Sequence, residues 1–228
     1  MSSAGQLTKA QVSEGYDQIA DRLQMSPKFY RLCFRLMRPH LKPGDTLVDL
    51  GCGQGRLLAE FAQGITGHFH GLDISFKLTA LAKTRLDEAL IVQGDVERLP
   101  WADAGFDAVL LTEVFEHLLA PQDALREIRR ILKPQGHLLL TIPNRDWFRY
   151  ESYQTERKRY QPVDDHWYSV SEVKEHLASA GFAVKRVRGA ENLYFGGGLP
   201  RLLEKLALVV YPKLHERMKR ALFVAQKK

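Results

Sequence analysis

One stretch, residues 46–58, constrains the fold of this chain more than any other. It starts as an apolar, β-rich run, passes through three glycines at alternate positions and ends in helix-forming residues, reading T-L-V-D-L-G-C-G-Q-G-R-L-L. Glycines permit positive φ and let a ligand touch the backbone. The free N–H groups at the start of the following helix favour electron-rich or anionic groups. The stretch therefore predicts a strand that turns sharply into a helix around a nucleotide-type cofactor.

Strands and helices alternate along the chain, with apolar strands and short turns rich in glycine and proline. Strands are expected over residues 46–50, 69–73, 90–93, 106–112, 137–142, 182–187 and 221–225. Helices are expected over residues 10–24, 26–37, 56–62, 77–86, 121–132, 171–180 and 199–211. This alternation predicts a doubly wound α/β sheet, in which ligands bind at the carboxyl ends of the strands.

Three aspartates narrow the choice of cofactor. A dinucleotide loop needs a third glycine for close helix–strand packing, but Arg56 occupies that position. Asp49, beside the loop, would repel a phosphate and would suit an ammonium group. Asp73 follows the second strand, where a carboxylate accepts hydrogen bonds from ribose hydroxyls, and Asp95 follows the third, within reach of an adenine amino group. A ligand with adenine, ribose and a cationic amino-acid tail fits these acids better than NAD does.

Composition favours an ordinary globular protein of a reducing compartment. The hydrophobic content of 45% and the charged content of 26% are typical of soluble domains. The two cysteines, Cys33 and Cys52, form no metal-binding or disulfide pattern. The N-terminus lacks the apolar core of a signal peptide, and no apolar run approaches the length of a membrane span. We expect a cytoplasmic protein.

The net charge of +6 lies in the last part of the chain, because residues 201–228 hold eight Lys or Arg and only two Glu. A nucleic-acid enzyme would more often place basic residues around its active cleft, so no nucleic-acid partner is expected. The apolar positions of residues 199–220, flanked by basic ones, suit a helix packed on the sheet. They also suit an interfacial helix near anionic lipid, which would put the protein at the periphery of the inner membrane face.

Six segments, each weak alone, occur in a characteristic order. They are V-D-L-G-C-G-Q-G at 48–55, L-D-I at 72–74, G-D-V-E-R-L-P at 94–100, F-D-A-V at 106–109, E-V-F-E-H-L at 113–118 and I-L-K-P-Q-G-H-L-L-L-T-I-P-N at 131–144. Together they resemble the class I S-adenosylmethionine-dependent methyltransferases, especially small-molecule enzymes similar to the ubiquinone-biosynthesis O-methyltransferases. The resemblance implies a Rossmann-like, mostly parallel seven-stranded sheet whose antiparallel final strand inserts between the fifth and sixth. It implies S-adenosylmethionine as cofactor, with S-adenosylhomocysteine as product.

The resemblance also assigns roles to matching positions. Asp49 would orient the methionine ammonium group, and Asp73 would hold both ribose hydroxyls. Asp95 and the backbone of Val96 would read the adenine edge, and Ile74 would pack on the ring, although Val96 and Ile74 also suit an ordinary core. The remaining cofactor-binding candidates are Gly51, Cys52, Gly53, Gly55, Thr112, Glu113 and Tyr16.

The methyl acceptor is expected to be a small apolar or aromatic molecule, with O-methylation favoured. Nucleic-acid and glutamine N-methyltransferases of this fold carry N/D-P-P-Y/F after the fourth strand, whereas residues 112–115 read T-E-V-F. A hydroxyl acceptor benefits from a general base, and the candidates are Glu116, His117, His166 and Tyr16. Residues 113–117 also match a segment associated with a divalent metal in the ubiquinone-biosynthesis enzymes. Because relatives without that role share the segment, no metal is expected.

We expect one domain, residues 1–228, built from an N-terminal helical cap (1–44), a cofactor-binding core (45–188) and a basic C-terminal helix with the last strand (189–228). The aromatic stretch 147–168 suggests a lid over the acceptor, or ordinary packing. Two alternatives stay open. The chain could bind S-adenosylmethionine without catalysis, or it could methylate a lipid at the membrane surface.

Overall fold

A seven-stranded sheet forms the centre of the computed structural model, which describes residues 8–22, 25–147, 151, 165–191 and 210–228. The strand order is β3-β2-β1-β4-β5-β7-β6, and β7 runs antiparallel to both of its neighbours. The strands are β1 (Thr46–Leu50), β2 (His68–Asp73), β3 (Leu90–Gln93), β4 (Phe106–Thr112), β5 (Leu132–Pro143), β6 (Phe182–Ala190) and β7 (Arg220–Lys227). The doubly wound sheet, with its antiparallel last strand between β5 and β6, is therefore confirmed.

The helices agree closely with those expected from the sequence. They are α1 (Lys9–Ile19), α2 (Pro27–Met37), α3 (Arg56–Gly64), α4 (Phe76–Arg85), α5 (Pro121–Ile131) and α7 (Val170–Ser179), with 3-10 turns η1 (Ala20–Arg22), η2 (Arg38–His40), η3 (Phe115–His117) and η4 (Pro212–Arg217). The hydroxyl of Ser26 caps α2 by accepting from the N–H of Phe29 at 3.3 Å. The N-terminal helix is shorter than expected, because its α-helical part ends at Ile19 and continues as the turn η1.

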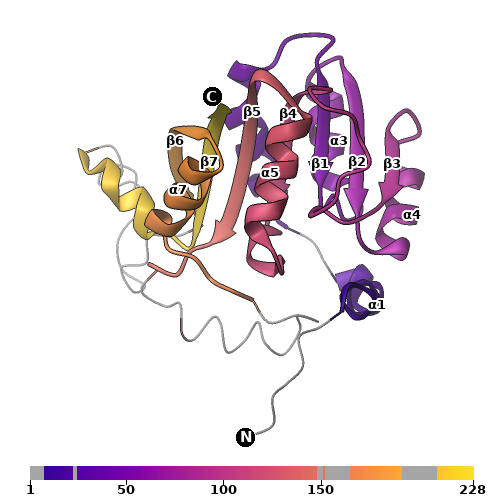
Figure 1. Cartoon of the computed structure of the whole chain (residues 1–228), viewed down its shortest axis with the longest axis horizontal. Helices are drawn as coiled ribbons and strands as arrows, with labels where there is room; N and C mark the ends of the chain where they lie inside the picture. The colour runs from indigo at the N-terminus through magenta and orange to yellow at the C-terminus, as the bar shows by residue number, and fades with distance from the viewer. Residues whose placement is uncertain (1–7, 23–24, 148–150, 152–164, 192–209) are drawn as a thin grey trace, which may run out of the picture.

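The sheet is buried between two layers of helices, as Figure 1 shows. One core lies under α5 and α7 and includes Val48 and Val109, while the other lies under α2 and α3 and includes Leu47 and Leu110. Neighbouring residues of β1 and β4 thus point into opposite cores, which explains why both strands are almost wholly apolar. With both faces covered, the carboxyl edge of the parallel strands is the place where a ligand can reach the sheet.

Three strands, β5, β6 and β7, are each longer than predicted by three residues or more. β5 starts at Leu132, which was expected to end the preceding helix, because Leu132 pairs with Phe106 before the register of the β4–β5 ladder shifts. Gln135, within this strand, has a φ of 64°. β6 and β7 extend past the predicted apolar cores into polar residues, since their mutual ladder runs from Phe182 to Ala190.

Two expected features fall mainly outside the described residues. These are the aromatic lid at 147–168 and the helix at 199–211. Among the helices that the structure describes, none combines the length and the apolar character needed to cross a membrane. The division into cap, core and C-terminal segment stays a prediction.

Helix α7 is anchored by a reciprocal cap that we expect to contribute measurably to stability. The Ser169 hydroxyl accepts from the N–H of Glu172 at 3.2 Å, and the Glu172 carboxylate accepts from the N–H of Ser169 at 2.8 Å. Ser169→Ala should cost about 1 kcal/mol and lower the melting temperature by roughly 2–4 °C, measured by circular dichroism. Thr84→Ala is the control, because its exposed hydroxyl bonds only within its own helix. An equal loss in both variants would contradict the capping role.

Candidate functional site

The glycine loop after β1 leaves part of its backbone open to a ligand. Gly51 and Gly53 have φ values of 72° and 52°, a region that residues with a side chain rarely adopt. A Cβ on Gly53 would meet nothing within 4 Å, whereas one on Gly51 would lie 2.3 Å from the Cγ2 of Val114. The loop therefore packs tightly on the segment after β4 at Gly51 and is accessible at Gly53. Helix α3 follows, with Gly55 at its N-cap and no side-chain cap.

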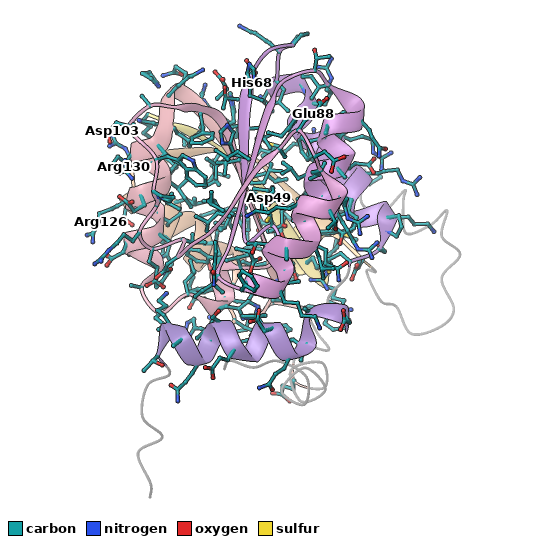
Figure 2. All side chains as sticks on the ribbon, turned by 90° about the vertical axis from the view of Figure 1, so that its right-hand side faces the viewer. Asp49, His68, Glu88, Asp103, Arg126 and Arg130 are labelled. Atoms are coloured by element: carbon teal, nitrogen blue, oxygen red, sulfur yellow. The ribbon has the colours of Figure 1, made fainter. Side chains whose placement is uncertain are left out.

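Asp49 is a buried carboxylate beneath this loop. Its side chain is almost fully covered, and Oδ1 has no hydrogen-bond partner among the described residues. Figure 2 shows Asp49 in the interior, while the other labelled charged residues lie toward the surface. Burial and the charge of Asp73 raise the pKa of Asp49 well above its usual range. A buried, incompletely bonded carboxylate is costly, and a cationic group placed against Oδ1 would offset that cost.

Asp73, at the end of β2, ties two loops together. One carboxylate oxygen accepts from the N–H of Gly53 at 2.8 Å, and the other accepts from the N–H of Ser75 at 2.9 Å. Burial raises the pKa of Asp73 to about 6, although the backbone hydrogen bonds act in the opposite direction. The carboxylate is thus fixed between the loops that follow β1 and β2.

The positions expected around the adenine lie next to helix α1. Asp95 accepts from the ammonium of Lys9 at 3.2 Å, and Val96 beside it is buried. The carbonyl of Ile74, a half-buried residue, accepts from the hydroxyl of Ser13 at 2.8 Å. Two further cofactor candidates follow or end strands: Cys52, in the glycine loop, is buried in the core under α2 and α3, and Thr112 is half-buried at the end of β4.

Helix α1 lies across the carboxyl edge of the sheet and contributes a residue that the sequence analysis missed. Figure 1 shows the helix apart from those that cover the two faces. Asp17 accepts from the hydroxyl of Ser75 and, at 3.0 Å, from the N–H of Lys77. The Gln54 side chain of the glycine loop donates to the carbonyl of Ala20 at 2.8 Å. These contacts hold α1 against the loops that carry the predicted cofactor residues.

A histidine–aspartate pair follows β4. Nδ1 of His117 lies 2.8 Å from Oδ1 of Asp165, and both side chains are at least 90% covered. On the other side of the ring, Nε2 lies 3.7 Å from a carboxylate oxygen of Glu116. The ring of Tyr16 meets the imidazole edge-on, with 5.9 Å between centroids. The structure therefore brings three of the base candidates together and adds Asp165, which the sequence analysis did not single out.

His166 occupies a different position. Its side chain is exposed and its ring lies against that of Tyr168, with 4.5 Å between centroids. Its backbone N–H donates to the carbonyl of Glu116 at 2.8 Å. This bond fastens the Asp165 segment beside His117, so His166 contributes to the cluster through its backbone.

Glu113 is bonded within the fold. Its carboxylate accepts from the hydroxyl of Thr141 at 2.9 Å and forms an ion pair with Arg220. Arg220 is deeply buried, which lowers its pKa to about 10, and it also pairs with Glu191 at 3.1 Å. The sequence analysis counted Arg220 only as charge of the basic tail. Among the residues that the structure describes, no group of three or more His, Cys, Asp or Glu is arranged to hold a metal ion.

Comparison with known proteins agrees with this geometry. Residues 48–140 match the family model described as a methyltransferase domain. The chain is 33% identical over 139 residues to the ubiquinone/menaquinone biosynthesis C-methyltransferase UbiE of Ectopseudomonas mendocina, covering 57% of this chain and 54% of that protein. It is 30% identical over 138 residues to the malonyl-[acyl-carrier protein] O-methyltransferase of Erwinia pyrifoliae, covering 59% and 52%.

These matches and the fold together support a class I S-adenosylmethionine-dependent methyltransferase. The chain spans about half the length of the two curated relatives named above. A solved structure from Thermotoga maritima, titled a possible histamine N-methyltransferase, superposes with a TM-score of 0.66 at 20% identity, covering 95% of this chain and 100% of that one. At 20% sequence identity, this superposition shows only that the two proteins share a fold.

The residues of this site fit S-adenosylmethionine. The carboxylate of Asp49, with its unbonded Oδ1, suits the ammonium group of the amino-acid tail. Asp73 is placed to accept from the ribose hydroxyls, and the accessible backbone at Gly53 permits close approach of the ligand. Glu113, another cofactor-binding candidate, has its carboxylate engaged by Thr141 and Arg220. The roles of the individual residues stay predictions.

The raised pKa of Asp73 predicts a pH dependence of cofactor binding. Only the ionised carboxylate accepts hydrogen bonds from both ribose hydroxyls, and in the ligand-free protein it gains a proton as the pH falls through about 6. The affinity for S-adenosylmethionine should be steady above pH 7 and fall below about pH 6, by up to roughly tenfold per pH unit for one proton. Asp49, whose pKa is also raised, acts in the same direction. Calorimetry from pH 5 to 8 tests this, and a flat profile would contradict it.

Proposed function

We propose that this methyltransferase transfers the methyl group of S-adenosylmethionine to an oxygen atom of a small apolar or aromatic acceptor. The observation that carries the proposal is the covered His117–Asp165 pair next to Tyr16. It follows β4 in the same segment as Val114, which packs on the glycine loop. A proton-accepting group therefore lies close to the predicted cofactor site.

The sulfonium of S-adenosylmethionine supplies an already activated methyl group, so the protein mainly has to align an acceptor and remove its proton. Asp165 accepts from Nδ1–H of His117, which leaves Nε2 as the acceptor nitrogen. Nε2 takes the proton of the acceptor hydroxyl. The carboxylates of Asp165 and Glu116, on opposite sides of the ring, stabilise the imidazolium that forms.

A carbon acceptor is the second candidate. It is favoured by the likeness to UbiE, which is named a C-methyltransferase, whereas the Erwinia relative is named an O-methyltransferase. The same base would deprotonate a phenol, whose ring carbon then becomes nucleophilic. The base pair supports either acceptor, and the position of the methyl group in the product distinguishes them.

An acceptor screen tests the proposal. The protein is incubated with S-adenosylmethionine carrying a ¹³C-labelled methyl group and with phenols, catechols, carboxylic acids and primary amines, and products are identified by mass and by the NMR shift of the label. A methyl group on oxygen would support the proposal. A carbon-bound methyl would favour the second candidate, and products from amines alone would contradict both. Calorimetry with S-adenosylhomocysteine and NAD is the parallel test of the cofactor, since tight binding of NAD alone would contradict it.

A further inference from the structure

Helix α2 presents a row of basic side chains to solvent. Lys28, Arg31 and Arg35 are exposed, as is Arg38 just after the helix, and this spacing puts them on one side. The opposite side packs into the core through Phe29, Cys33, Leu36 and Met37. The helix contains no acidic residue, so its row of positive charge has no counter-ion within the helix itself.

The edge strand β6 adds more positive charge on the same side of the sheet. Lys185 and Arg186 are exposed, Arg188 is half-buried, and the strand has no acidic residue. Arg186 and Arg188 pair across the ladder with Val224 and Leu222, which belong to the core under α2. Directly opposed side chains point to the same face of a sheet. The two arginines therefore lie on the α2 side.

The two rows form one electrostatic surface. Burial is the main cause that lowers the pKa of Arg188, and the positive charges of Arg186 and Arg35 lower it further. Burial, and after it the charge of Arg186, lower the pKa of His40 at the end of the following turn η2. We call the set Arg31, Arg35, Arg38, Lys185, Arg186 and Arg188 the basic face. Within the described ranges, none of its members forms an ion pair with an acidic side chain.

An exposed apolar pair adjoins the basic face. Val210 and Tyr211 are 62% and 65% exposed and directly precede η4. This turn packs on β6, since the Arg188 guanidinium lies 2.9 Å from Nε2 of His215. Protein surfaces that lie in a membrane interface typically combine basic side chains with exposed apolar and aromatic ones.

We propose that the basic face, with Val210 and Tyr211, docks this methyltransferase on a bilayer that contains anionic phospholipid. The arginines would meet the headgroup phosphates, and the apolar pair would enter the boundary between headgroups and acyl chains. An acidic protein or an RNA would also attract the arginines, but would leave the exposed apolar pair unexplained. The proposed docking does not depend on which molecule accepts the methyl group. It extends the membrane contact expected of residues 199–220, of which only 210–220 are described, to helix α2 and strand β6.

Vesicle sedimentation of the full chain tests the docking surface. The protein should bind vesicles of phosphatidylcholine mixed with phosphatidylglycerol, should not bind phosphatidylcholine alone, and should be released as salt screens the charges. The triple variant Arg31→Gln, Arg35→Gln, Arg186→Gln should bind anionic vesicles roughly a hundredfold more weakly, at about fivefold per residue. Val210→Ser with Tyr211→Ser should remove the part of the binding that resists salt.

A matched triple variant, Lys83→Gln, Arg126→Gln, Arg129→Gln, lowers the net charge equally at exposed positions of α4 and α5. It should bind like the unaltered protein. All variants should keep the circular dichroism spectrum and the affinity for S-adenosylmethionine, because none of these residues lies in the cofactor site. Equal binding by both triple variants would overturn the proposal. The proposal would also be overturned if the unaltered protein did not bind anionic vesicles, for example if it bound only RNA or acidic proteins.

Discussion

Replacing Asp73 with alanine is expected to weaken the binding of S-adenosylmethionine by roughly 10²- to 10⁴-fold, measured by calorimetry. Two charge-assisted hydrogen bonds to the ribose would be lost, at roughly 1.5–3 kcal/mol each. The structure adds a second cause, because the same carboxylate accepts from the N–H groups of Gly53 and Ser75. Without it, the loops after β1 and β2 lose their shared acceptor, so the effect should lie in the upper part of this range.

Two further variants separate these causes. Asp73→Asn keeps the shape and one acceptor oxygen but removes the charge, so its affinity should fall between those of the alanine variant and the unaltered protein. Asp103→Ala is the control for loss of a carboxylate, because Asp103 is exposed and pairs with Arg130 away from the site (Figure 2). Unchanged affinity in a folded Asp73→Ala variant would refute the ribose assignment.

The fold could be predicted because its signals are local. The apolar run of β4 and the glycines after β1 each specify their own backbone geometry within a few residues. The same applies to Asp49 and Asp73, whose positions at strand ends follow from the strands themselves. The structure shows Asp49 buried and Asp73 bonded to the glycine loop, as these positions suggest.

The missed residues are those that act through distant partners. Asp17 reaches Ser75 from 58 residues away, and nothing in the pattern of α1 marks it among the other polar residues of that helix. Arg220 belongs by sequence to a basic tail, yet β7 carries it into the interior against Glu113. Long-range pairing of charged side chains depends on the packing of whole elements. Periodicity and composition do not contain that information.

His117→Ala is expected to slow methyl transfer to a hydroxyl acceptor by roughly 10²- to 10⁴-fold, the usual contribution of a general base. The affinity for S-adenosylmethionine should change far less than the rate, because the imidazole contacts none of the predicted ammonium or ribose ligands and meets only one cofactor candidate, Tyr16, through its ring edge. The rate is measured with the acceptor found in the screen. A loss of cofactor affinity equal to the loss of rate would contradict the base assignment.

Asp165→Asn tests whether the pair acts through the tautomer of the histidine. An amide would donate to Nδ1 and so favour the proton on Nε2, the nitrogen that must accept from the substrate. The variant should therefore lose at least about a hundredfold in turnover, with little change in the KM for the acceptor. His166→Ala is the matched control, because the His166 ring is exposed and lies against Tyr168. If His166→Ala reduced turnover as strongly as His117→Ala while Asp165→Asn did not, the base would have to be reassigned to His166.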